Sequence, residues 1–243
     1  MEIQVIPNKP EFESLLELYP PILASKIKPE WYKKLPLEYP DPGEAMDMST
    51  ARKCPAIQDI INTGLIIPMW GKFFFKTRKL EEGHWEQRWW IQNEHVYDYD
   101  LNFWITQHKE LQMDGMDIGR IANGGILKIK YPFRFIPPKG YGLMFHDPFY
   151  HFRKDIRCLN GLVKSDEWGF ITFPFEILKD NFEIEAGAPM VHVYLVKLET
   201  EKLTVNARPA TEDEYKDNEF VFMQDTLAGT NYKTRKEPYK RKI

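Results

Sequence analysis

Apolar residues recur along most of this chain in short runs with the two-residue period of β-strands. Between residues 125 and 207 six such runs follow one another, and glycine, proline, asparagine and aspartate separate them. No long amphipathic helix lies between the runs, so we predict an antiparallel barrel or jelly roll rather than a parallel α/β sheet. The six runs are GILKIKYPFRFIPP, GYGLMFHDP, IRCLNGLV, WGFITFPFEIL, FEIEAGAPMVHVYLVKL and KLTVNA.

Two earlier runs, residues 65–78 and 84–92, predict a β-hairpin with its turn at Gly83. Alternation along the second run places Trp89 on one face and Trp90 on the other.

The aromatic residues of 85–104 could stack on nucleic-acid bases beside Arg88. The surrounding sequence is acidic, and carboxylates repel phosphate, so core packing or contact with a protein partner fits this stretch better. The acidic residues are Glu82, Glu86, Glu94, Asp98 and Asp100.

A proline-rich segment precedes these strands, after a short strand-like start at the amino terminus. It holds six prolines between residues 20 and 42. Because proline fixes φ and lacks an amide donor, we expect an extended strap. The stretch PEWYKKL allows one helical turn there, and its Trp31 and Tyr32 are candidate partner-binding residues.

The pattern therefore predicts three regions. Residues 1–63 form the strap and a connector with a turn of helix at 50–62. Residues 64–206 form the β domain, with an irregular excursion at about 93–123 that holds one short helix. Residues 207–243 form a short helix and a carboxy-terminal arm.

Charge is distributed unevenly along the chain. The net charge is −3, yet residues 233–243 carry +5 and the preceding 232 residues carry −8. Such a tail suits an acidic partner surface, and it is the one segment that we expect to contact nucleic acid. The candidate partner-binding residues of the tail are Lys233, Arg235, Lys236, Lys240, Arg241 and Lys242.

The sequence has no membrane or export signal that we can identify. Its apolar stretches are far shorter than the roughly 20 residues of a membrane-spanning helix, and the amino terminus lacks a basic segment followed by an apolar one. We therefore expect a soluble protein that is not secreted by a signal peptide. Cys54 and Cys158 form no CxxC pair, and we expect both thiols to be free.

Residues 137–198 resemble the trimeric dUTPase and dCTP deaminase family in the order of their motifs. PPKGYGLMF is similar to a strand that follows a Pro-Gly-Tyr turn, GLVKSDEWG to the catalytic turn, and FEIEAGAPMVHVYLVKL to a later strand of that family. The resemblance implies a β-clip barrel and a trimer.

A second resemblance covers most of the chain. CPAIQDIINTGLIIPMW and PEWYKKLP are similar to segments of an uncharacterised family of tailed-phage and bacterial proteins. This likeness implies a phage protein located in the host cytoplasm or in the virion.

The chain departs from the enzyme family where the chemistry is done. In the enzymes the first aspartate of the catalytic turn orients the attacking water; Lys164 matches that position, and Asp166 matches the second aspartate. A lysine ammonium cannot accept a proton from water at neutral pH. The phosphate-binding Ser-Gly-Leu strand is replaced by FHDPFYHF. We therefore expect no hydrolysis.

A candidate ligand-binding set remains in this region: Tyr141, His146, Asp147, His151, Asp166 and His192. Two histidines and one carboxylate can bind a metal ion, but the spacings match no ligand pattern. His146 and His151 point to opposite faces if the chain between them is extended. We expect neither a metal nor a cofactor.

The leading hypothesis is a non-catalytic, phage-encoded binding or assembly protein, a virion component that associates with copies of itself or with other virion proteins through its strap and arm. One alternative is a nucleotide-processing enzyme with a pocket rebuilt around His146, Asp147 and His192. Another is a sponge that sequesters a nucleotide or signalling molecule. No membrane partner is expected.

Overall fold

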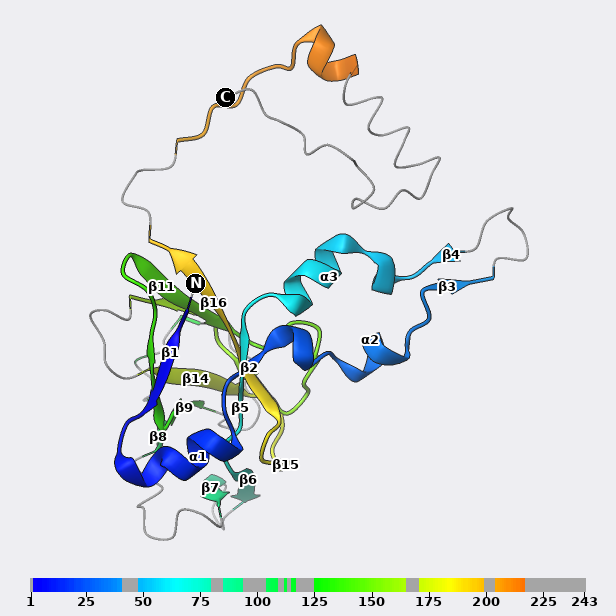
Figure 1. Cartoon of the computed structure of the whole chain (residues 1–243). Helices are drawn as coiled ribbons and strands as arrows, with labels where there is room; N and C mark the ends of the chain where they lie inside the picture. The colour runs from blue at the N-terminus through cyan, green and yellow to red at the C-terminus, as the bar shows by residue number, and fades with distance from the viewer. Residues whose placement is uncertain are drawn as a thin grey trace. The chain divides into compact units, whose positions relative to one another are not determined.

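The fold is mainly β, with several antiparallel sheets and a few short helices (Figure 1). This confirms the predicted antiparallel β class, although the described strands form no closed barrel. The computed structural model describes residues 2–40, 48–79, 85–93, 104–108, 112, 115–116, 125–164, 171–198 and 204–216.

The chain divides into two compact units. The first contains Met1–Lys28 and Asn62–Leu198, and we call it the sheet unit. The second contains Pro29–Ile61 and Glu199–Ile243, and we call it the strap unit. Among the described residues, no helix is both long and apolar enough to cross a lipid bilayer. Both cysteines are free thiols, as expected, and Cys158 is buried in the sheet unit.

The strap unit contains short elements. The helical turn predicted at PEWYKKL is α2, Glu30–Lys34, and the helix predicted within 50–62 is η3, Ala51–Lys53, followed by α3, Pro55–Asn62. Strands β3 (Glu38–Tyr39) and β4 (Met48–Ser49) pair antiparallel.

Residues 212–216 of the strap unit are helical, as predicted. The strand predicted for KLTVNA is wrong in its described part. Residues 204–207 are exposed and irregular, and a strand that neither pairs nor buries a face has nothing to stabilise it.

A five-stranded antiparallel sheet carries the site considered below. Its strand order is β13-β11-β16-β5-β2. The strands are β13 (Gly161–Val163), β11 (Tyr141–His146), β16 (Pro189–Lys197), β5 (Leu65–Pro68) and β2 (Ile22–Leu23). Leu143 and Phe145 of β11 point into the core, and Met144 and His146 point to the opposite, outer face.

A β-bulge in β16 decides which of its side chains reach the outer face. The register with β5 shifts between Pro189 and Val191, and the neighbours Met190 and Val191 both lie in the core. The residue that follows the bulge, His192, therefore points to the outer face.

A four-stranded sheet, ordered β12-β14-β9-β8, lies across the core from the first. The ring of Phe145 on β11 meets that of Phe173 on β14 edge-on, with their centroids 5.1 Å apart. Strand β8 was not predicted: it lies inside the segment expected to be an irregular excursion. The strands are β12 (Ile156–Cys158), β14 (Thr172–Ile177), β9 (Ile126–Lys130) and β8 (Ile105–Gln107).

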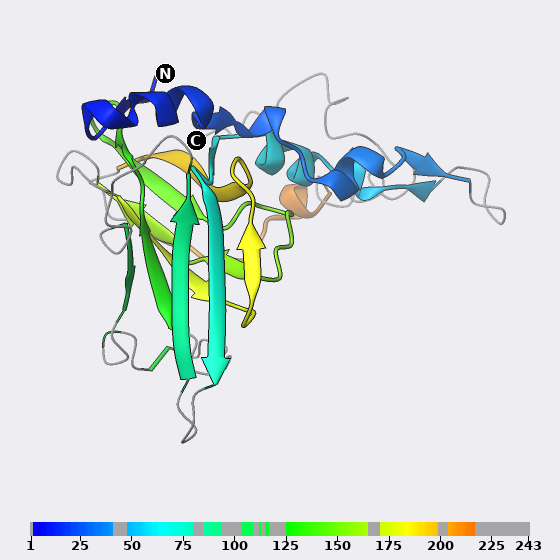
Figure 2. The same cartoon turned by 90° about the horizontal axis from the view of Figure 1, so that it is seen from below.

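The predicted hairpin is β6 (Lys72–Lys79) paired with β7 (Trp85–Gln92), and β15 (Phe182–Ile184) lies beside β6 (Figure 2). The apolar run of residues 65–78 is not one strand, however. It breaks at Gly71, so that β5 joins the five-stranded sheet and β6 joins the hairpin. A Cβ at position 71 would lie 2.9 Å from the carbonyl oxygen of Gln92, so glycine permits the close approach.

The remaining elements close the core. Strand β1 (Gln4–Pro7) confirms the strand-like start and pairs with β10 (Phe133–Ile136). The turn η1 (Pro10–Phe12) leads into helix α1 (Glu13–Leu18). The ring of Phe12 packs edge-on against Trp104, with the centroids 5.0 Å apart. The segment of η1 and α1 thereby covers one side of the aromatic core through Phe12 of η1 and Leu15 of α1, both buried.

Gly161, in the motif that resembles a catalytic turn, lies within strand β13 and does not form a turn. It stands opposite Phe145 of β11. A Cβ at position 161 would lie 2.8 Å from Cε1 of the Phe145 ring. The glycine is therefore explained by packing, because only its hydrogen leaves room for that ring.

We predict that Gly161→Ala lowers the free energy of unfolding by about 1–3 kcal/mol, the usual cost of overpacking. Chemical denaturation followed by circular dichroism measures it. Phe145→Leu removes the obstructing ring edge, so the same glycine substitution should cost clearly less in that background. An equal cost in both backgrounds would contradict the packing explanation.

Candidate functional site

Four rings gather on the outer face of the five-stranded sheet. His146, at the end of β11, lies directly opposite His192 of β16, with their ring centroids 5.0 Å apart. The ring centroids of Phe149 and His146 lie 3.7 Å apart, and the ring of Tyr194 stacks on that of His192 with the centroids 4.5 Å apart. We call these four residues the histidine–aromatic cluster. Antiparallel register places three of its members on one face, and the chain leaving β11 supplies Phe149.

Both histidines use one ring nitrogen and leave the other without a hydrogen-bond partner. Nε2 of His192 donates to the carbonyl oxygen of Thr63 at 2.7 Å, and Nδ1 of His146 donates to the carbonyl oxygen of Asp147. The other nitrogens, Nδ1 of His192 and Nε2 of His146, are buried and have no partner. A carbonyl accepts only from N–H, so these bonds fix the tautomer of each neutral ring.

Burial keeps this pair of rings uncharged. His146 and His192 are only 5% and 2% exposed. The pKa of His192 is lowered to about 4, mainly by desolvation and also by the nearby His146 and His151, against the opposing effect of the Thr63 hydrogen bond. Desolvation also lowers the pKa of His146. A second proton would sit on a buried nitrogen with no acceptor, so the cluster favours packing over proton transfer at neutral pH.

The loop of residues 147–155, which supplies Phe149, is held by polar contacts. Oδ1 of Asp147 accepts from the amide of Cys158 at 3.0 Å, and burial raises the pKa of its carboxyl group. The guanidinium of Arg153 donates two hydrogen bonds of 3.0 Å to the carboxylate of Asp155. Tyr150 and Phe152 both have left-handed backbones, with φ of 62° and 49°. A left-handed backbone is costly for aromatic residues, so the surrounding contacts hold the loop in one conformation.

An exposed apolar pair lies next to the cluster. Met144 of β11 faces Leu162 of β13 across the sheet, and Tyr194 flanks Met144 on its other side. Leu162 is 54% exposed and Met144 is 38% exposed. Strand β13 is the last strand of this sheet in the described part of the chain. We call Leu162 and Met144 the edge pair.

The structure brings together some of the predicted ligand-binding residues and separates others. His146 and His192 meet, and His151 lies close enough to affect the charge of His192. Asp147 turns instead to β12. Tyr141 stands opposite Lys197, five residues before His146 on the same strand and hence about 17 Å from it.

Lys164 follows β13 directly and is exposed. The other residues of the catalytic-turn motif and of the basic tail lie outside the described residues: Asp166, Lys233, Arg235, Lys236, Lys240, Arg241 and Lys242.

The two candidate partner-binding aromatics of the strap belong to α2. Tyr32 is buried, and its hydroxyl donates to the carbonyl oxygen of Arg52 at 3.2 Å. The Trp31 ring meets that of Tyr32 edge-on at 5.7 Å. The hydrogen bond from Tyr32 to Arg52 ties α2 to η3 within the strap unit.

Sequence reasoning missed Phe149, Tyr194 and the edge pair. Alternation along β16 gives the correct faces only after the bulge is known, because an unbroken strand would put His192 on the same side as Met190. Within the described ranges, no three His, Cys, Asp or Glu side chains are grouped so that they could hold a metal ion.

Comparisons of the chain with protein-family models, with curated proteins and with solved structures each gave no match.

The buried neutral histidines predict a pH-dependent stability. The folded-state pKa of His192, about 4, is below its ordinary 6.5. Its neutral form therefore contributes fully to the free energy of unfolding above pH 6.5, and this contribution is lost as the pH falls toward 4. At pH 5 the free energy of unfolding should be lower by about 2 kcal/mol because of this group. In His192→Gln the side-chain amide keeps a donor for Thr63 but cannot titrate. Denaturation at pH 7 and at pH 5 should show a smaller difference for the variant, and equal differences would contradict a neutral buried His192.

Proposed function

We propose that this chain is a non-catalytic binding and assembly protein that associates with copies of itself. The observation that carries the proposal is the edge pair, Leu162 and Met144, exposed side by side at the edge of the five-stranded sheet. Exposed apolar surface at a sheet edge is costly in water and is typical of a surface that another chain covers.

A second copy of this chain fits the edge better than an unrelated partner. Strand β13 offers an edge for strand addition, which needs a short extended segment, and the chain itself supplies such segments. The short paired strands of the strap unit expose Tyr39 (45%) and Met48 (56%), and Leu37, directly before β3, is 52% exposed. A subunit that has both an exposed apolar edge and exposed apolar strands can satisfy each with its neighbour.

The finer assignment rests on the resemblance. We propose a dUTPase-like β-clip scaffold, a trimeric assembly and a role in the virion of a tailed phage. Two antiparallel sheets that face each other across one core support this scaffold, as does the position of GLV at the sheet edge directly before Lys164.

Replacing Leu162 should disrupt the assembly. We predict that the wild-type chain sediments at three times its mass of 28.9 kDa and that Leu162→Glu sediments as a monomer, because a carboxylate cannot be buried in an apolar interface. Leu18→Glu, at a similarly exposed residue of α1 (49%), is the matched control and should remain trimeric. A monomeric wild type, or a Leu162→Glu variant of unchanged mass, would overturn the proposal.

The same proposal predicts no nucleotide turnover. The exposed Lys164 ammonium occupies the position of the water-orienting carboxylate and cannot take up a proton. Incubation with a panel of nucleoside triphosphates, followed by chromatography, should leave each of them intact, and equilibrium dialysis should detect no stoichiometric binding. Turnover that disappears in His146→Asn or Asp166→Asn would favour the enzyme, and tight binding without turnover would favour the sponge.

A further inference from the structure

The outer face of the β6–β7 hairpin carries two stacked aromatic rings, each with a lysine ammonium close to it. The rings of Phe74 and Trp90, opposite each other in register, lie 4.8 Å apart and nearly parallel at 8°. The ammonium of Lys72 lies 5.4 Å from the Phe74 ring centroid, and that of Lys76 lies 5.7 Å from the Trp90 ring. The neighbours Phe73 and Phe75 point into the core, so this stack lies on the opposite face.

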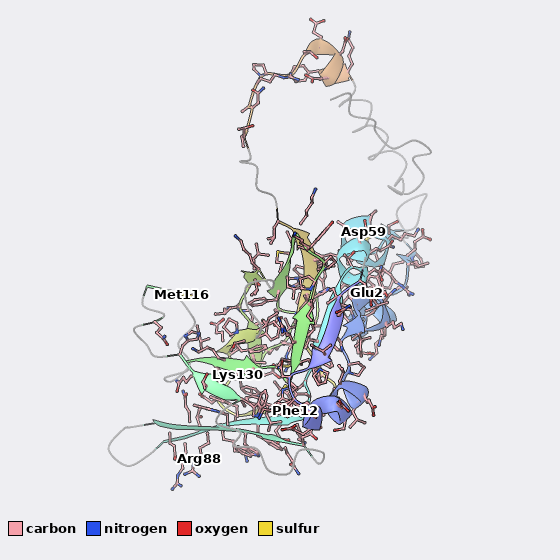
Figure 3. All side chains as sticks on the ribbon, turned by 60° about the vertical axis from the view of Figure 1, so that its left-hand side comes forward. Glu2, Phe12, Asp59, Arg88, Met116 and Lys130 are labelled. Atoms are coloured by element: carbon pink, nitrogen blue, oxygen red, sulfur yellow. The ribbon has the colours of Figure 1, made fainter. Side chains whose placement is uncertain are left out.

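Further cations continue along the same face. Lys76 stands opposite Arg88, and Arg78 stands opposite Glu86. The side chain of Arg88 is 70% exposed, and Figure 3 shows it extending away from the body of the sheet unit. Same-face residues along a strand repeat every two positions, about 6.8 Å apart. The face therefore presents a row of cations beside a pair of partly buried rings.

Carboxylates balance part of this charge. Lys72 forms ion pairs with Glu183 and Glu185, with N···O distances of 3.1 and 2.8 Å. Arg88 forms an ion pair with Glu86 at 2.8 Å. Within the described residues, Lys76 and Arg78 have no carboxylate within ion-pair distance. The ion pairs engage Lys72 and Arg88, so the cations of this face that lack an ion pair among the described residues are Lys76, beside Trp90, and Arg78.

We propose that this face binds a single-stranded nucleic acid. Aromatic rings on a sheet surface with interspersed cations are the elements that stack bases and neutralise phosphates in proteins that bind single strands. Lys76 and Arg78, two positions apart on β6, are separated by about 6.8 Å, which is close to the step between phosphates in an extended strand. The cation–π contact of Lys76 with Trp90 is exposed and therefore weak, so a base can take its place on the ring while the ammonium moves to a phosphate.

A single strand suits this face better than a duplex or an acidic protein. The bases of a duplex are already stacked and turned inward, so Trp90 would gain nothing from it. An acidic polypeptide would engage the cations but would leave the rings unused. The proposal goes beyond assembly, and it differs from the expectation that only the basic tail contacts nucleic acid. Of the acidic residues that supported that expectation, only Glu86 is described, and it is already engaged by Arg88.

Fluorescence anisotropy of a labelled oligothymidylate, titrated with the full-length chain over a range of salt concentrations, tests the proposal. The double variant Lys76→Ala/Arg78→Ala should bind roughly tenfold more weakly and should lower the slope of log K against log salt by about 1.4, or about 0.7 per phosphate contact. The double variant Lys139→Ala/Lys154→Ala, which removes two exposed lysines of the same unit, is the matched control and should bind as the wild type does.

A second pair of variants separates stacking from charge and the hairpin from the tail. Trp90→Leu keeps an apolar cover on the sheet but cannot stack, so it should weaken binding about tenfold with little change in the salt slope. A chain in which the six basic tail residues are glutamine should still lose affinity when Lys76 and Arg78 are replaced. Circular dichroism of each variant reports whether it is folded.

Several results would overturn the proposal. Wild-type chain that does not bind the oligonucleotide at low salt would do so, as would hairpin variants that bind with unchanged affinity and slope. Complete loss of binding in the glutamine-tail chain would assign the contact to the tail alone. Equal affinity for a duplex, or for polyglutamate with the same dependence on Trp90, would show that the occupant is not a single strand.

Discussion

The antiparallel pairing of β11 with β16 is the constraint on which the rest of the sheet unit depends. Six residue pairs hold the two strands in register. On one side they direct Leu143, Phe145 and Val193 into the core. On the other side they set His146 against His192 and Met144 against Tyr194. A shift of one residue would exchange the two faces, burying histidines in the core and exposing phenylalanine, so packing and candidate surface are fixed by the same hydrogen bonds.

The alternation of apolar and polar residues predicted most of the strands and the β6–β7 hairpin, because it reports which face of a strand is buried. Glycine, proline, asparagine and aspartate between the runs marked the turns. The hairpin β6–β7 and the helical turns of the strap agree with the predictions. The break at Gly71, the bulge near Met190 and strand β8 do not follow from alternation, since each depends on a partner strand distant in sequence. The candidate site was predictable only in part: His146 and His192 meet, whereas Asp147 turns to Cys158 because a backbone amide there needs an acceptor.

The outer surfaces of the sheet unit differ in chemistry, so each suits a different kind of partner. The face of β11 and β13 is apolar at its edge, which suits contact with another copy of the chain. The face of β6 and β7 combines rings with cations, which suits a flexible polyanion. The histidine–aromatic cluster is a third region, buried and neutral, and its hydrogen bonds go to the carbonyl oxygens of Thr63 and Asp147. An assembly protein that also holds a nucleic-acid strand would need these roles on separate surfaces.

Hydrogen–deuterium exchange measured as a function of protein concentration tests the central claim, that β13 lies in an interface between copies of this chain, most directly. Peptides covering residues 156–164 should exchange more slowly as the concentration rises, because assembly covers the edge strand. Peptides covering the central strand at 126–130 should exchange at one rate throughout. If exchange at 156–164 does not depend on concentration while the mass of the assembly does, the copies meet elsewhere and the account is wrong.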